Sequence, residues 1–473
     1  MNKTGASLIH YARPTVLDCP QPKNLVESRQ NPNVVHPART FTVVRRASVD
    51  LPDVARAHPM HQALVEAARR VAGVLSGASL SATDLQGLMP IEFRRDVHDL
   101  VFGTLRRYAK GDAMLRQLVD REPDNDVRAL LLVSLYRLDR RPDSEHVVVD
   151  QAVDAAGAMT NRKAGGFVNA VLRNFLRKRA VLAQQATELP EVIHQHPAWW
   201  VQRVQAAWPD HWREVMDVSN EPPPVSLRVN VRRTSRTQYL TRLLDAGISA
   251  SALDGFEAAI RLPDGVRVDA LPGFSDGDFA VQDPGAQLAA EWLDLADGQG
   301  VLDACAAPGG KSGHLLELAK IDLLALDVDA NRCRRIEDNL KRLGHQARIV
   351  VGDAGKPELW WDGQPYDRIL ADVPCTASGV VRRHPDVKWL RREDDIRKFA
   401  RAQMSLLRAL WPLLAPGGKL LYATCSVFPE ENHLQISAFN AAFPEASLVR
   451  QTQLLPNARH DGFFYALLEK PLA

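Results

Sequence analysis

The sequence predicts an α/β protein, with a Rossmann-like, mostly parallel sheet in its C-terminal half and an all-α domain before it. Three observations support this fold class. From about Phe274 onward, strand and helix patterns alternate, and this βαβ rhythm is typical of a mainly parallel sheet. From about Pro59 to Glu188, apolar residues recur instead with helical periodicity. Between these parts, a Pro-rich break at residues 221–224 precedes a small α/β segment.

Length and composition indicate a globular protein of several domains. The chain has 473 residues, so two to four domains are expected. Its hydrophobic content of 45% and charged content of 25% are sufficient for sizeable cores. No apolar run has the length of a membrane-spanning helix, so we expect a soluble protein. Because the net charge is only +2, any affinity for nucleic acid must come from local basic patches.

The cysteines are odd in number and far apart, and no C-x-x-C pattern occurs among them. This spacing argues against a zinc site or a disulfide framework, and we predict no metal ion. It also indicates a reducing, cytoplasmic compartment in which free thiols are available for chemistry. The five residues are Cys19, Cys305, Cys333, Cys375 and Cys425.

We predict four segments along the chain. Residues 1–57 are rich in Pro, Asn and Arg and show no sustained periodicity. We expect either that they form a poorly ordered extension or that the start codon has been assigned too far upstream. Residues 58–190 form the helical domain, and residues 191–273 a linker with a small α/β subdomain. Residues 274–473 form the sheet domain.

Apolar stripes predict five helices in the helical domain. They span His61–Leu75, Ile91–Arg107, Asp126–Leu138, His146–Ala158 and Gly166–Leu182. The last helix also has a basic side, which includes Arg173 and Arg177. Such a side is usually only solvated, and contact with an RNA backbone is the second interpretation.

In the small subdomain, strands are predicted at Val225–Val231 and Ala259–Leu262, with a helix at Gln238–Ala246 between them. Arg228 and Asn230 lie on the first strand. They form either a charged sheet edge or a contact for phosphates, and the sequence alone does not decide between these interpretations.

The sheet domain is predicted to contain five strands that alternate with helices. The strands span Val301–Ala304, Leu323–Val328, Ala347–Val351, Asp367–Asp372 and Lys419–Thr424. Helices are expected at Asn331–Leu343, Asp395–Leu414 and Glu430–Phe443. A closing antiparallel element is expected at Phe463–Leu468.

A small-residue turn follows the first of these strands, within the sequence G-V-L-D-A-C-A-A-P-G-G-K-S at Gly300–Ser312. A strand, a glycine turn and a helix start place backbone N–H groups and a positive dipole end beside a crevice. We therefore predict a cofactor site at this turn. Its residues are Cys305, Ala306, Ala307, Pro308, Gly309, Gly310 and Lys311.

Two carboxylates follow on neighbouring strand ends. Asp327 can accept hydrogen bonds from both ribose hydroxyls of a cofactor on the turn, and Asp353 can accept one from an adenine amino group. A nicotinamide oxidoreductase would share Asp327. The turn, however, lacks G-x-G-x-x-G, and Pro308 removes an N–H group that a pyrophosphate would use. The pattern therefore favours an adenosine cofactor without a diphosphate.

The fourth and fifth strands both end beside a cysteine, Cys375 and Cys425. Carboxyl ends of parallel strands share one rim, so the thiols are expected to converge. A thiolate that adds to C6 of cytosine makes C5 a nucleophile for the methyl group of S-adenosylmethionine. Lys311 would favour the thiolate, and Asp372 would support negative charge at N3 of the base. A second thiol would assist release, but the residues alone do not rank the two.

Three stretches together resemble a known family: Gly300–Ser312, Asp372–Asp386 and Tyr422–Asn432. They are similar to the RNA cytosine-C5 methyltransferases of the Sun family, above all to members that modify small-subunit ribosomal RNA. Those members carry an N-terminal NusB-like helical RNA-binding domain. The helical domain predicted here has the same position in the chain. The resemblance covers about Pro59 to the C-terminus, and implies a seven-stranded S-adenosylmethionine-dependent methyltransferase domain.

The resemblance also implies roles for individual residues. Cys425 would attack C6 and Cys375 would assist product release, whereas DNA cytosine methyltransferases attack with the cysteine of their Pro-Cys motif. The cofactor turn with Asp327, Asp353 and Asp372 would hold S-adenosylmethionine. A basic stretch after the Pro-Cys motif is expected to contact substrate phosphates or to be solvated; it includes Arg382, Arg383 and His384.

By this resemblance the substrate is 16S rRNA, free or in an early assembly intermediate, with cytosine 967 as the target, and the enzyme is expected to act as a monomer. Two alternatives remain at this point. A tRNA cytosine-C5 methyltransferase would share the catalytic domain without explaining the NusB-like one. A non-catalytic NusB-like RNA-binding factor would explain only the helical domain.

Overall fold

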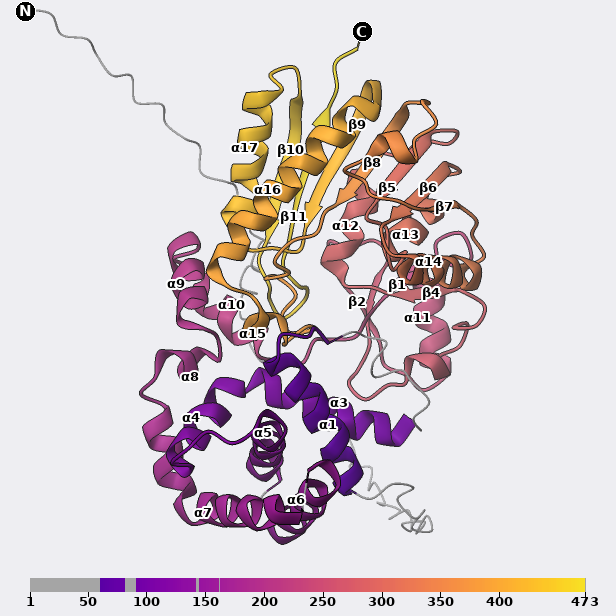
Figure 1. The fold of residues 1–473 in the computed structure, drawn as a ribbon. Coiled ribbons are helices and arrows are strands. Elements are labelled where there is room, and N and C mark those ends of the chain that lie inside the picture. The colour runs from indigo at the N-terminus through magenta and orange to yellow at the C-terminus, as the bar shows by residue number, and fades with distance from the viewer. Residues whose placement is uncertain (1–59, 81–90, 142–143, 161, 473) are drawn as a thin grey trace, which may run out of the picture. The chain divides into compact units, whose positions relative to one another are not determined.

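The computed structural model describes residues 60–80, 91–141, 144–160 and 162–472. The expected N-terminal extension, residues 1–57, lies outside the described residues, and so does Cys19. From Met60 onward the chain forms one contact unit. Along this unit a helical domain, a small α/β subdomain and a sheet domain follow one another (Figure 1).

The helical domain packs around a single apolar core. Its helices are α1 (Met60–Leu75), α3 (Ile91–Arg106), α4 (Tyr108–Leu118), α5 (Asn125–Arg140), α6 (Glu145–Met159) and α7 (Arg162–Ala186). Helix α5 is buried on nearly all sides because its sequence is apolar around most of its circumference, and the other helices surround it (Figure 1). The five expected helices are confirmed. Helix α4 was not expected, because Lys110, Gly111 and Asp112 interrupt its apolar pattern.

Three short helices connect this domain to the rest of the chain: α8 (Pro190–His194), α9 (Ala198–Ala207) and α10 (Trp212–Ser219). Trp200, Trp208 and Trp212 from this segment share an apolar cluster with Phe428 of the sheet domain. The indole N–H of Trp208 also donates to the carbonyl oxygen of Val427 at 2.8 Å. The connecting helices are therefore packed against the sheet domain instead of forming a free linker.

The small subdomain is an antiparallel sheet of order β2-β3-β1-β4 with one helix. Its elements are β1 (Ser226–Val229), α11 (Arg236–Asp245), β2 (Ser251–Ala252), β3 (Ala259–Arg261) and β4 (Phe279–Val281). Strand β4 pairs with β1, so this sheet extends beyond the expected boundary at residue 273. The three residues of β4 are too few to show a strand period in the sequence.

The sheet domain contains seven strands in the order β10-β11-β9-β8-β5-β6-β7. They are β5 (Gly300–Ala304), β6 (Asp322–Asp327), β7 (Arg348–Val351), β8 (Tyr366–Asp372), β9 (Leu414–Thr424), β10 (Ser447–Leu454) and β11 (Phe463–Glu469). The first five are parallel, while β11 pairs antiparallel with β9 and β10. The expected mostly parallel sheet is confirmed. Strand β10 was not expected because its sequence is largely polar and exposed.

Helices cover both faces of this sheet, and each face has its own apolar core. One face packs against α12 (Pro284–Trp292), α13 (Gly310–Leu318) and α14 (Ala330–Leu343). The other packs against α16 (Glu393–Leu410) and α17 (His433–Ala442). Among the helices that the structure describes, none combines the length and the apolar character that crossing a membrane requires.

Candidate active site

The glycine turn lies between β5 and α13, as the sequence predicts. Gly309 has a φ of 91°, and a Cβ there would lie 3.0 Å from the Cα of Ile336, so only glycine fits without strain. The turn is tied to the next strand because Ala306 N–H donates to the carbonyl oxygen of Leu326 at 2.8 Å. A Cβ at Gly310 would meet no atom within 4 Å, so the first residue of α13 faces open space.

Asp327 ends β6 and is almost fully buried. Its Oδ2 accepts a hydrogen bond from the N–H of Ala307 at 3.1 Å, which fixes the turn against the end of β6. Its Oδ1 accepts from Asp329 N–H at 3.2 Å and lies 3.3 Å from Arg332 Nη1. A carboxylate offers about four lone-pair sites, so Oδ2 keeps acceptor capacity for a ligand hydroxyl.

Asp353 lies just beyond β7, the strand next to β6 in the sheet. Its side chain is half-exposed, and Oδ1 accepts from the N–H of Gly355 at 2.9 Å. Acceptors therefore stand at two neighbouring strand ends, and the first of them, Asp327, contacts the turn that contains Pro308, which has no N–H group. These residues fit an adenosine cofactor better than a dinucleotide, for which the turn offers too few donors.

Replacing Asp327 by alanine should weaken binding of S-adenosylmethionine by about 1.5–3 kcal/mol, because a charged hydrogen-bond acceptor at this strand end is lost. Isothermal titration calorimetry with the full chain measures this change. Asp322 is an exposed residue at the opposite end of β6, and Asp322→Ala is the matched control with unchanged affinity. Equal affinities for the two variants would remove Asp327 from the site.

A charged pair links the turn to the neighbouring strand β8. Lys311 Nζ lies 2.6 Å from Asp372 Oδ2. Burial is the largest single influence and lowers the pKa of Lys311, but the charge of Asp372, its hydrogen bond and the smaller effects of Cys425 and Asp303 together raise that pKa above its ordinary value. An ionised Cys425 also raises the pKa of Lys311. The ammonium group therefore contacts Asp372 and interacts at longer range with Cys425.

Sequence reasoning missed Asp303, which is fully buried within β5. Its Oδ2 accepts from the hydroxyl of Ser312 at 2.6 Å. Burial raises the pKa of Asp303 to about 7, and the hydrogen bond from Ser312 opposes this shift. An acidic residue inside an otherwise apolar strand was the signal that could have identified it.

The two thiols converge as expected: Cys375 Sγ and Cys425 Sγ are 3.3 Å apart. They are not equivalent, because Cys425 is partly exposed whereas Cys375 is only 8% exposed. The hydrogen bond with Cys425, together with burial, raises the pKa of the Cys375 thiol well above its ordinary range. The tertiary structure thus separates an accessible thiol near Lys311 from a buried thiol that stays protonated.

The loops that carry these thiols are held together by close backbone contacts. Gly379 N–H donates to the carbonyl oxygen of Cys425 at 2.8 Å, and the carbonyl oxygen of Gly379 accepts from Gly462 N–H at the same distance. A Cβ on Gly379 would lie 2.4 Å from the carbonyl oxygen of Gly462, so this approach requires glycine. The hydroxyl of Ser378 also accepts from Val427 N–H at 2.9 Å.

Arg228 and Asn230 of the small subdomain are fully buried, so the charged-edge and the phosphate interpretations both fail for these two side chains. Arg228 donates to both carboxylate oxygens of Glu317 on α13, at 2.8 and 2.6 Å, and to the carbonyl oxygen of Gly310 at 2.7 Å. It therefore joins the small subdomain to the start of the cofactor helix. A buried arginine needs such partners because an unpaired buried charge is very unfavourable.

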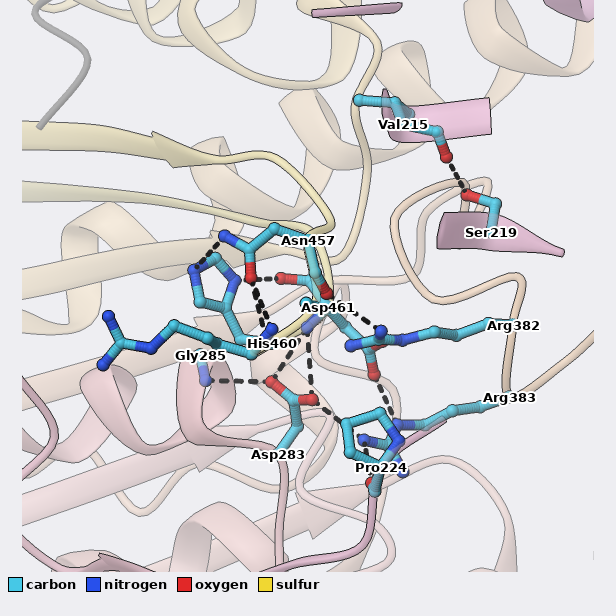
Figure 2. A network of polar contacts seen from close by, with 12 residues as sticks. Val215, Ser219, Pro224, Asp283, Gly285, Arg382, Arg383, Asn457, His460 and Asp461 are labelled. Atoms are coloured by element: carbon cyan, nitrogen blue, oxygen red, sulfur yellow. Dashed lines mark hydrogen bonds and ion pairs between the residues drawn. The ribbon is translucent and has the colours of Figure 1, made fainter. Parts of the chain in front are cut away.

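The basic stretch after the Pro-Cys motif belongs to a network of polar contacts with Asp283 and Asp461 (Figure 2). Arg382 is buried and pairs with Asp461, and Arg383 pairs with Asp461 and with Asp283. Burial and the adjacent Asp461 raise the pKa of Asp283 to about 7. The expected phosphate contact does not fit the buried guanidinium of Arg382, because its charge is already paired inside the protein. His384 is exposed.

The same stretch contacts the helical domain. Arg106 on α3 donates to the carbonyl oxygen of Arg382 at 2.8 Å. The indole of Trp389, in the short helix α15 (Val387–Leu390), donates to the carbonyl oxygen of Leu105 at 2.8 Å. Lys388 is fully buried at this contact. The segment that follows the Pro-Cys loop therefore forms part of the contact between the helical and sheet domains.

Arg173 and Arg177 are exposed on α7, as a contact with RNA would require. Arg173 lines a cavity of about 660 Å³ between α6 and α7, together with Asp150 and Asn169. Of the residues expected to bind RNA, only these two and His384 present exposed side chains, with Arg383 half-buried.

Three known domain families match the chain in succession. They are the NusB family at residues 74–177, the ferredoxin-like domain of RsmF/B-like methyltransferases at residues 196–269, and the 16S rRNA methyltransferase RsmB/F family at residues 290–469. These ranges lie, in order, within the helical domain, within α9, α10 and the small subdomain, and within the sheet domain.

Curated relatives match over nearly their whole length. The chain is 41% identical over 412 residues to ribosomal RNA small subunit methyltransferase B of Proteus mirabilis, which covers 85% of this chain and 97% of the relative. It is 43% identical over 422 residues to the protein of the same name from Sodalis glossinidius, with coverages of 86% and 97%.

Solved structures show the same architecture. PH0851 superimposes with a TM-score of 0.73 at 26% identity, covering 87% of this chain and 98% of that one. NSun6 from Pyrococcus horikoshii, solved with SFG, has a TM-score of 0.53 at 22% identity, covers 58% of this chain and 98% of its own, and shows the fold alone. From its sequence identity to the curated relatives and its three matching domains, the chain belongs to the RsmB/F family of 16S rRNA methyltransferases, which use S-adenosylmethionine as methyl donor.

Proposed function

We propose that this protein methylates C5 of cytosine 967 in 16S rRNA through a covalent bond between Cys425 and C6 of the base. The observation that carries the proposal is the thiol pair, 3.3 Å apart at the ends of β8 and β9, beside the Lys311–Asp372 pair and the cofactor turn. Bound S-adenosylmethionine supplies an electrophilic methyl group. The remaining steps belong to residues of this chain.

Cys425 is the attacking thiol because it is partly exposed and because a thiolate there would be stabilised by the ammonium group of Lys311. Its thiolate forms a bond to C6, and the electron pair of the C5–C6 double bond becomes available at C5 for the methyl group. Asp372 holds a proton at N3 of the base while charge develops there.

Release reverses the covalent step. The proton on C5 passes to solvent water, its electron pair re-forms the C5–C6 double bond, and the bond from C6 to sulfur breaks, which returns an electron pair to Cys425. The thiol of Cys375 stays protonated at a sulfur–sulfur distance of 3.3 Å and can donate a hydrogen bond to the leaving thiolate. The buried thiol therefore suits release and the accessible thiol suits attack.

Methyl transfer from labelled S-adenosylmethionine to unmodified 16S rRNA, followed by mapping of the product base, tests this function. We expect 5-methylcytosine at position 967 of free or partly assembled small-subunit rRNA. Unmodified tRNA in a parallel reaction is the comparison substrate. Labelling of tRNA alone would contradict the proposal and assign the catalytic domain to tRNA.

Helix α7 is proposed to contribute to RNA affinity through Arg173 and Arg177. The double variant Arg173→Ala/Arg177→Ala should bind rRNA more weakly, with a log–log salt slope smaller by about 1.5, because each phosphate contact releases roughly one counterion. Filter binding over a range of salt concentrations measures the slope. Arg69→Ala/Arg121→Ala removes two exposed charges from the same domain as a control. Identical slopes for both double variants would mean that the basic side of α7 is only solvated.

A further inference from the structure

Glu431 is a fully buried carboxylate between the two loops that carry the thiols. Its Oε1 accepts hydrogen bonds from the N–H of Thr376 at 2.9 Å and from Gln403 Nε2 at 3.0 Å. Its Oε2 accepts from the hydroxyls of Thr376 and Ser426, both at 2.5 Å. Thr376 directly follows Cys375 and Ser426 directly follows Cys425. One carboxylate therefore contacts the neighbour of each thiol.

The neighbours of Glu431 hold the other sides of the same loops. Gln403 Nε2 also donates to the carbonyl oxygen of Pro374, which precedes Cys375, at 3.0 Å. Asn432 accepts from the hydroxyl of Thr424, which precedes Cys425, at 2.6 Å, and donates to the carbonyl oxygen of Ser426 at 2.8 Å. We call Gln403, Glu431 and Asn432 the thiol clasp. Through it, the residues on both sides of both thiols are fixed.

Glu431 and Lys311 carry opposite charges and act on different thiols: Glu431 acts on Cys375, and Lys311 acts on Cys425. The four donors to Glu431 are neutral groups, and burial raises its pKa while these hydrogen bonds oppose the shift. The pKa of Cys375 is raised by the hydrogen bond with Cys425, by burial and by the charge of Cys425, in that order of size. The negative charge of Glu431 makes a further, smaller contribution in the same direction. The other titratable group at this side is Tyr422, whose hydroxyl lies 2.7 Å from the carbonyl oxygen of Glu431. The thiol pair thus lies between an acidic side at Cys375 and the ammonium group of Lys311 at Cys425.

We propose that Glu431 is a positioning residue that assigns different roles to the two thiols. The clasp holds both loops at the observed sulfur–sulfur distance, and the negative charge of Glu431 disfavours a thiolate at Cys375, so that Cys425 attacks and Cys375 supports release. This inference rests on the proposed covalent mechanism. It adds a residue that touches neither base nor cofactor and acts through the two cysteine loops.

The variant Glu431→Gln tests the role of the charge while preserving the shape of the clasp. The amide oxygen can accept from the two N–H donors, and the amide nitrogen can donate to the hydroxyl oxygens of Thr376 and Ser426. The matched control is Glu430→Gln. Glu430 is the preceding residue, is partly exposed and pairs with Arg203.

The first measurement is the pH dependence of alkylation of Cys375 by iodoacetamide, followed by peptide mass spectrometry, in a Cys425→Ala background. It needs neither RNA nor cofactor. At a fixed pH below the titration midpoint, Glu431→Gln should raise the alkylation rate by about tenfold, which corresponds to a downward shift of roughly one pH unit. Glu430→Gln should leave the profile unchanged. An unchanged profile in Glu431→Gln would overturn the inference.

The second measurement is steady-state methylation with both cysteines present. Glu431→Gln should lower kcat by about tenfold while the KM for rRNA and the affinity for S-adenosylmethionine stay unchanged, because only the thiol chemistry is altered. Loss of cofactor affinity, or a parallel loss of melting temperature, would instead indicate a merely structural role. If Cys425→Ala still methylates RNA, the proposed mechanism fails; if that variant is inactive and the profile of Cys375 does not move, only the inference about Glu431 fails.

Discussion

Replacing Cys425 by alanine should abolish methyl transfer, by at least about a thousandfold, while binding of S-adenosylmethionine persists. The sulfur that bonds to C6 is then missing, and C5 of cytosine is too electron-poor to take the methyl group without it. Labelled methyl transfer to 16S rRNA measures the activity, and calorimetry measures the retained cofactor binding. Cys333→Ala is the control for loss of a thiol, because Cys333 is buried against the carbonyl oxygens of Asp327 and Val350.

Cys375→Ala should have a different effect from Cys425→Ala. Attack through Cys425 remains possible, but the leaving sulfur loses the thiol 3.3 Å away, so the adduct should break slowly. A protein–RNA complex that survives denaturing gel electrophoresis should therefore accumulate. The double variant should show no such band, because trapping requires the attacking sulfur. Trapping by Cys425→Ala instead would reverse the two roles and match the arrangement of DNA cytosine methyltransferases.

Replacing Arg228 by alanine should lower the free energy of unfolding by about 3–5 kcal/mol, because Glu317 would become a buried carboxylate without its partner. The same change removes the hydrogen bond to the carbonyl oxygen of Gly310, so cofactor binding should weaken in parallel. Denaturant unfolding followed by tryptophan fluorescence measures the stability.

Arg267→Ala is the matched control for Arg228→Ala. Arg267 belongs to the same subdomain, and its pair with Asp269 is exposed on both sides. Its loss should leave the unfolding midpoint unchanged, since exposed ion pairs contribute little. A folded Arg228→Ala protein with wild-type stability and a reduced salt slope for RNA binding would restore Arg228 to the set of phosphate contacts.

The contacts of the basic stretch suggest why the helical and sheet domains occur together. The segment that follows Cys375 leads through Arg382 and Arg383 to the paired carboxylates of Asp283 and Asp461, and then to Arg106 and Trp389 at the helical domain. The Pro-Cys loop is therefore supported by the domain that is expected to hold RNA.

The sequence by itself determined the fold class and the order of the domains, and it predicted which residues gather at the strand ends. Local patterns were sufficient because β5, β6 and β8 contain apolar stretches with an acidic residue at or next to the carboxyl end, and because carboxyl ends of parallel strands share one rim whatever their exact packing. For the same reason the approach of Cys375 and Cys425 was predictable from the strand order alone.

Only the tertiary structure decided which charges are exposed and which thiol is accessible. Arg228 and Arg382 look like surface cations in the sequence, but their partners Glu317 and Asp461 lie 89 and 79 residues away and were not recognisable as partners. The two thiols have similar local surroundings in the sequence, and their difference arises from the deeper burial of Cys375 and from Lys311, which comes from another segment of the chain. Burial and ion pairing depend on such distant neighbours, so local sequence patterns do not contain them.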